Sequence, residues 1–265
     1  MTVKKFCSLF IALAMLASLC VSMLSCGDDN NDETDNNEGK IESASYYLEQ
    51  SDDKIKAANG NFACEITQTA VVKNDGQQLS STDVKTEIFS DGTNYKLTTD
   101  ANGTISNTVV AGDWIYMQSG IQKVKILSTD QSVENIVGDF DETITEGMEY
   151  TAFSGGTVTK TSAGDYQISF SDQDGIFDDE IEELKESFEL SMPGSVCTVE
   201  SYTLEILIGS DLNYKSVDMD IAITILYSGE TLDLTQTISY AYKDIGAVAA
   251  ITAPADADSY VEASY

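Results

Sequence analysis

The sequence predicts an α+β fold, in which a long, curved antiparallel β-sheet curls over a few helices. Three observations predict this fold. Runs rich in Thr, Val, Ile and Tyr recur along most of the chain. Gly-, Asn- and Asp-containing turn signals separate these runs about every 8 to 12 residues, as in an antiparallel meander. Two further segments space their apolar residues as a helix does.

The first expected element is a helix over residues 43–58, which Ser43 or Ser45 caps and Asn59-Gly60 ends. A short helix over 130–139, a hairpin over 151–171 and a helix over 178–190 are expected in the middle of the chain. Strands are expected over 61–72, 81–90, 93–100, 104–111, 113–120, 121–127, 195–209, 213–229 and 230–242.

The last three strands alternate apolar and polar residues, so each has one face toward the core and one toward water. Turns are expected at Asn74-Asp75-Gly76, Asn102-Gly103 and Ser228-Gly229. The residues expected to point inward from the last two strands are Val217, Met219, Ile221, Ile223, Ile225, Tyr227, Leu232, Leu234, Ile238, Tyr240 and Tyr242.

The first 25 residues have the parts of a lipoprotein signal peptide. Lys4 and Lys5 precede an apolar stretch that is too short for a comfortable membrane span. The motif Met23-Leu24-Ser25-Cys26 matches a lipobox, in which the thiol after the cut receives lipid. We therefore expect lipidation of Cys26, followed by an acidic flexible tether over 26–40. The alternative is ordinary secretory cleavage that leaves Cys26 free.

The chain is strongly acidic, with a formal net charge of −31, and its basic residues are all Lys. Cleavage after residue 25 removes two lysines and no acid, so the charge becomes −33. A nucleic-acid partner is not expected, because phosphate binding needs clustered Lys and Arg. Anionic headgroups should also repel this surface, so lipid rather than protein charge is expected to hold the chain at a membrane.

Two cysteines, Cys64 and Cys197, remain in the expected domain. In an exported protein they could form a disulfide across a long loop. The alternative is two buried thiols that pack as small apolar side chains.

Catalytic chemistry lacks its usual residues, because the chain has no His. This absence excludes a Ser-His triad and an imidazole base, and we expect neither an enzyme nor a cofactor. The acid-rich segment SDQDGIFDDEIEE does not match an EF-hand loop, since Phe170 and Ile181 would occupy its end positions. A looser calcium site and a solvated helix start stay open as interpretations for Asp172, Asp174, Asp178 and Asp179.

Several phrases occur in a recognisable order: KAANGNF, EIFSDGTNYKL, a hairpin with IYM and KVKI, and a closing DIGAVAAITAPADA. With the lipidated tether, they resemble the LolA/LolB superfamily and its LppX/LprG-like lipoprotein relatives over residues 41–256. The resemblance implies a half-barrel whose helices plug the concave side, with acyl chains held between them. Carriers of the Lol pathway use an Arg to handle cargo, and this chain has none. The resemblance therefore implies a relative that binds another ligand.

The resemblance and the inward rows suggest an apolar pocket, and a packed core without a cavity is the alternative. We expect one domain over 41–256, a C-terminal tail over 257–265, and a monomer anchored outside the cytoplasm, at the cell surface. Its expected function is to bind an apolar envelope ligand without catalysis; the alternative is a structural lipoprotein with a protein or glycan partner. The candidate pocket residues are Trp114, Tyr116, Tyr202, Met219, Ile221, Ile223 and Tyr240.

Overall fold

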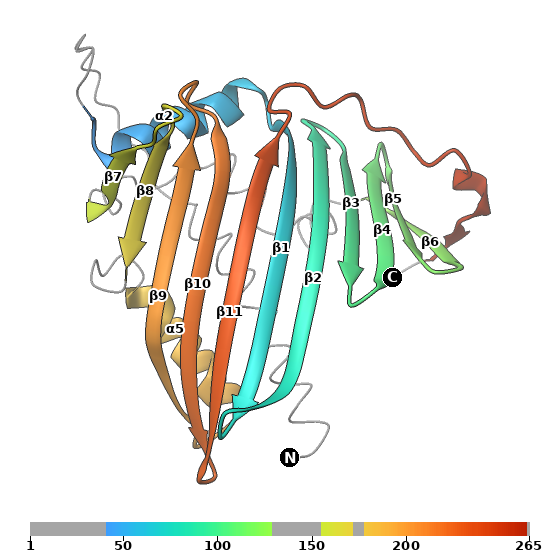
Figure 1. Cartoon of the computed structure of the whole chain (residues 1–265). Helices are drawn as coiled ribbons and strands as arrows, with labels where there is room; N and C mark the ends of the chain where they lie inside the picture. Colours follow the sequence, from blue (N-terminus) through green and yellow to red (C-terminus); the bar gives the residue numbers. More distant parts are fainter. Residues whose placement is uncertain (1–40, 129–154, 172–177, 264–265) are drawn as a thin grey trace.

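A computed structural model describes residues 41–128, 155–171 and 178–263, and these residues form one open, curved sheet of twelve strands (Figure 1). The predicted α+β half-barrel is therefore confirmed. The strand order is β12-β6-β5-β4-β3-β2-β1-β11-β10-β9-β8-β7. The strands are β1 (Asn61–Asn74), β2 (Gln77–Asp91), β3 (Tyr95–Ala101), β4 (Thr104–Ala111), β5 (Trp114–Ser119), β6 (Gln122–Leu127), β7 (Thr157–Lys160), β8 (Tyr166–Ser171), β9 (Val196–Ile208), β10 (Tyr214–Tyr227), β11 (Glu230–Lys243) and β12 (Val261–Glu262).

The helices of the described residues are α2 (Ala44–Ala57), α5 (Asp178–Ser191) and the 3-10 turn η2 (Ala257–Ser259). Ser43 caps α2, because its Oγ accepts a hydrogen bond of 3.2 Å from the backbone N–H of Tyr46. The helix expected over 178–190 is α5. None of the described helices has the length and apolar character needed to cross a bilayer.

The tight turns between long strands form where the sequence predicts them. Ser228 and Gly229 have φ of 54° and 83°, and Asp75 and Gly76 have φ of 48° and 76°. Two successive residues with positive φ match the right-handed twist of the strands that they join. The longest strands lie at the centre of the sheet, where β11 pairs with β1 and β10 (Figure 1). Every neighbouring pair is antiparallel except β12 with β6, which is parallel.

One face of the sheet packs against both helices, and we call it the inner face. It bears Cys64, Ile221 and Tyr240, and the opposite side is the outer face. Figure 1 shows α2 and α5 on the same side of the sheet. The Tyr214 hydroxyl at the start of β10 donates to Oδ1 of Asp52 in α2 at 2.7 Å. From α5, Phe188 is fully buried in the same hydrophobic core.

The C-terminal residues belong to the folded domain, although residues 257–263 were expected to be part of a tail. They form η2 and β12, and Tyr260 is buried. Val261 pairs with Val124 of β6, so this segment extends the sheet at that edge. Residues 1–40, including Cys26, and the helix expected over 130–139 lie outside the described residues.

Candidate functional site

The inner face of three adjacent long strands, β9, β10 and β11, is the candidate site. Strand register places side chains from neighbouring strands on one face, because directly paired residues point to the same side. Tyr202 pairs with Ile221, and Met219 pairs with Ile238. Five predicted pocket residues are buried on this face: Tyr202, Met219, Ile221, Ile223 and Tyr240.

The other two predicted pocket residues, Trp114 and Tyr116, lie on the outer face, so their assignment to the pocket is wrong. They alternate along β5 with Ile115 and Met117. Met117 is linked to Cys64 by successive paired residues across β4, β3 and β2, which places Met117 on the inner face. Trp114 and Tyr116 must therefore point the opposite way.

On the outer face, these two residues belong to a group that we call the outer aromatic cluster: Trp114, Tyr116, Lys123, Lys125 and Tyr260. The Lys125 Nζ lies 4.7 Å from the centroid of the Trp114 ring, a cation–π contact. The Tyr116 and Tyr260 rings meet edge to face, with centroids 5.4 Å apart. The C-terminal segment therefore completes this cluster.

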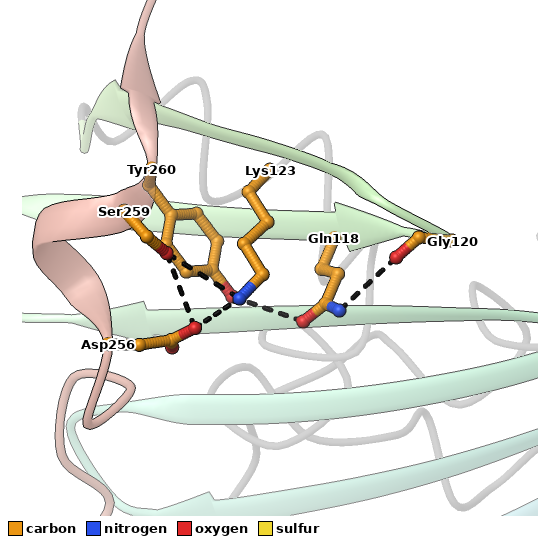
Figure 2. Close-up of polar contacts among 6 residues, drawn as sticks. All are labelled: Gln118, Gly120, Lys123, Asp256, Ser259 and Tyr260. Atoms are coloured by element: carbon orange, nitrogen blue, oxygen red, sulfur yellow. Dashed lines mark hydrogen bonds and ion pairs between the residues drawn. The ribbon is translucent and has the colours of Figure 1, made fainter.

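A polar network holds the C-terminal segment beside β5 and β6 (Figure 2). Lys123 Nζ donates to Asp256 and to the Ser259 hydroxyl, and Ser259 donates to Asp256. The Tyr260 hydroxyl donates to Oε1 of Gln118 at 3.5 Å. The Lys123 ammonium lowers the pKa of the Asp256 carboxyl below its ordinary value. The carboxylate is therefore ionised at neutral pH.

Gln236 is the inner-face residue that the sequence pattern did not identify. It lies at the centre of β11 and is only 1% exposed. Neither its Nε2 nor its Oε1 has a hydrogen-bond partner. A buried, unpaired amide costs about 1–3 kcal/mol. The signal in the sequence is a gap in the apolar alternation of β11, where Gln236 stands between Leu234 and Ile238.

The two cysteines of the domain are free, which corrects the disulfide interpretation. Cys197 pairs with Ile225, which is in register with Leu232 and then with Asn74. Asn74 is ten residues from Cys64 along β1. At about 3.3 Å per residue the two thiols are separated by roughly 33 Å along the sheet, far beyond a disulfide's reach.

Burial determines the chemistry of both thiols. It raises the pKa of Cys64 to about 12 and the pKa of Cys197 to about 11. At neutral pH both are therefore un-ionised, and a thiol is a poor nucleophile compared with its thiolate.

The calcium interpretation concerns residues that are only partly described. Asp172 and Asp174 lie outside the described residues, as do the side chains of Asp178 and Asp179 in the first turn of α5. Among the side chains that the structure describes, no group of three acidic, Cys or His residues is placed to hold a metal ion.

No protein-family model matches the chain, and no curated protein matches its sequence. Its structure is similar to that of LprF from Mycobacterium bovis, with 15% identity, 80% of this chain and 96% of that chain covered, and a TM-score of 0.34. It is also similar to a LolA superfamily protein from Nitrosomonas europaea, with 11% identity, coverage of 75% and 93%, and a TM-score of 0.22. A DUF1329 family protein from Desulfovibrio piger matches with 7% identity, coverage of 77% and 94%, and a TM-score of 0.24.

Proposed function

We propose that this chain is a lipid-anchored, extracytoplasmic lipoprotein at the cell surface, whose domain binds an apolar envelope ligand without catalysing a reaction. The ligand class is an acyl chain, a lipid or a glycolipid. The observation that carries the proposal is the continuous apolar inner face of β9, β10 and β11, on a sheet whose strand order does not close. A broad apolar face of this kind suits long hydrocarbon chains, which need area and few directional contacts.

The chemistry of the inner face supports a binding role over a reaction. Apart from Gln236, its central side chains are aliphatic or aromatic, including Met219, Ile221 and Ile223. The two thiols are un-ionised at neutral pH, as their raised pKa values require. The chain has no His to act as a general base at that pH.

Native mass spectrometry of the protein, expressed in bacteria with its own signal and released in mild detergent, tests the binding role. We expect a non-covalent adduct with the mass of a lipid, in addition to the covalent lipid proposed on Cys26. The variant Ile221→Phe fills space on the inner face and should reduce the adduct. Thr203→Phe adds a similar bulk on the outer face and should leave it intact, because Thr203 is exposed. A wild-type protein that is folded and carries no non-covalently bound lipid would contradict the proposed binding role.

The anchor is tested separately. Labelled palmitate should enter the wild-type protein and sediment with membranes, and Cys26→Ala should abolish both signals. Globomycin should block cleavage of the signal peptide. Retention of the Cys26→Ala protein at the membrane would show that the anchor is not a lipid on this cysteine.

A second function, contact with a protein or glycan partner, is favoured by the edge of the sheet near the outer aromatic cluster. Leu127 is 60% exposed and is the strand partner of half-buried Trp114. Trp114 is the only Trp, so its fluorescence reports on this surface alone. Titration with purified envelope polysaccharide should quench or shift this emission if a glycan binds there, and an unchanged spectrum would exclude that partner.

A further inference from the structure

Gln236 stands out among the inner-face residues because its amide is buried and has no hydrogen-bond partner. Both the donor Nε2 and the acceptor Oε1 are buried without a hydrogen-bond partner. Buried side-chain amides in folded proteins are nearly always paired, so an unpaired one needs a physical explanation. A functional role in a second, liganded state is one such explanation.

The residues paired with Gln236 across the sheet and its inner-face neighbours along β11 offer the amide nothing to bond. Across the sheet it is in register with Ile221 of β10 and Ala70 of β1. Along β11 its inner-face neighbours are Leu234 and Ile238, both buried. All four side chains are apolar and uncharged, so no local change of rotamer among them can supply a partner.

We propose that the Gln236 amide is the polar recognition point of the inner face, and that it binds a hydroxyl group carried on the acyl chain of the ligand. This inference rests on the proposed binding of an apolar ligand. The hydroxyl donates to Oε1 and accepts from Nε2. The bound hydroxyl thereby gives the amide the hydrogen bonds that it lacks in the free protein.

The chemistry of the amide narrows the ligand class. An ester carbonyl only accepts, so it would leave Oε1 unpaired. An ionised carboxylate would need a cation or several donors at this apolar position, and Ile221, Ala70, Leu234 and Ile238 provide neither. A hydroxyl group is uncharged and both donates and accepts. A saturated chain without a hydroxyl would bury the amide unpaired, as in the free protein.

Displacement of a dansylated fatty acid from the purified protein tests this inference. The competitors are stearate and a panel of hydroxystearates that differ only in the position of the hydroxyl. We expect at least one isomer to bind about five- to tenfold more tightly than stearate, the scale of one or two hydrogen bonds whose partner would otherwise be buried unpaired. The variant Gln236→Leu should abolish this preference, so that the hydroxystearates and stearate displace the probe equally well.

Gln68→Leu is the matched control, because Gln68 of β1 is in register with Ile238 on the same face but is only half-buried. Gln68→Leu should keep the preference for a hydroxystearate over stearate. The inference is overturned if no isomer is preferred, or if Gln236→Leu retains the preference. If neither stearate nor any hydroxystearate displaces the probe, the proposed function itself fails, which is a separate result.

Thermal unfolding without ligand gives a second readout. Gln236→Leu and Gln236→Met should each unfold at a higher temperature than the wild type, because both remove an unpaired buried amide. A lower unfolding temperature for both variants would mean that the amide is paired within the folded chain, and this would overturn the inference.

Discussion

Asp91 shows how a single carboxylate connects distant parts of the chain. Its Oδ2 accepts a hydrogen bond of 2.6 Å from the backbone N–H of Ile251, and its Oδ1 accepts from the N–H groups of Asn94 and Thr93. Burial alone would raise the pKa of Asp91, but these amide donors lower it below the ordinary value. The ionised side chain of Asp91 therefore holds the chain around Ile251, which follows β11, against the end of β2.

The lowered pKa of Asp91 gives a pH dependence with a definite sign. Because the folded pKa lies below the unfolded one of about 3.9, the stabilisation is complete above that value. It is lost as the pH falls through the folded pKa. Asp91→Asn should cost about 2 kcal/mol at pH 7, and the difference from wild type should shrink below about pH 4. Urea unfolding at several pH values measures this difference in unfolding free energy. Asp75→Asn, in an exposed turn, is the control.

Substitutions at Gly92 and Gly103 distinguish the cost of backbone strain from the cost of a steric clash. Both have positive φ, +90° and +84°, which disfavours any side chain. A Cβ on Gly92 would lie 2.5 Å from the carbonyl oxygen of Asn59, whereas a Cβ on Gly103 would meet nothing within 4 Å. Gly103→Ala should cost about 1 kcal/mol, and Gly92→Ala about 1–3 kcal/mol more. Equal losses of unfolding free energy for the two variants, measured with denaturant, would show that the loop near Asn59 moves aside.

At the scale of elements, α2 is fastened to the sheet by a buried polar contact inside an apolar interface. The Tyr214 hydroxyl donates to Asp52 at 2.7 Å and approaches the carbonyl oxygen of Leu48 at 3.4 Å. The Tyr47 ring also stacks on Tyr166 of β8, with ring centroids 4.1 Å apart. These contacts orient the helix over the upper end of the sheet in Figure 1.

Removal of the Tyr214 hydroxyl should loosen α2. Tyr214→Phe deletes the donor to Asp52 while keeping the ring, so we expect a loss of about 1–3 kcal/mol in the free energy of unfolding. Hydrogen exchange should speed up at the amides of α2 more than at those of β4. Tyr46→Phe, at an exposed position of the same helix, should change neither measurement.

The C-terminal segment protects one edge of the sheet. Ala263 donates its backbone N–H to the carbonyl oxygen of Lys125, and Val261 pairs with Val124. A chain that ends at Asp256 would expose the edge of β6 and uncover Tyr116. We expect faster hydrogen exchange in β5 and β6, together with concentration-dependent association in light scattering. Unchanged exchange in these two strands would mean that the segment contributes little to this edge.

At the scale of the whole molecule, the sheet keeps the two cysteines at opposite ends of its long strands. The purified domain should therefore contain two free thiols, and a reducing agent should not change its unfolding temperature. Because the pKa values are raised to about 12 and 11, alkylation by iodoacetamide at pH 8 should be slow until urea unfolds the protein. A mass decrease of two hydrogens would reveal a disulfide and contradict this separation.

The sequence by itself determined the local features of this protein. Ser43 predicts the start of α2, and Ser228-Gly229 predicts the turn between β10 and β11, because caps and tight turns depend on a few adjacent residues. Alternation along β10 likewise predicts that Met219, Ile221 and Ile223 share a buried face, since successive side chains in a strand point to opposite sides.

Only the tertiary structure decided which faces and residues meet between strands. Alternation groups residues within one strand, but pairing register decides which of these groups share a face. This register places Trp114 and Tyr116 on the outer face and Ile221 on the inner face. The same register separates Cys64 from Cys197. It also surrounds Gln236 with apolar side chains from β1 and β10, which are distant in sequence. These relations depend on long-range hydrogen bonding, which no local pattern encodes.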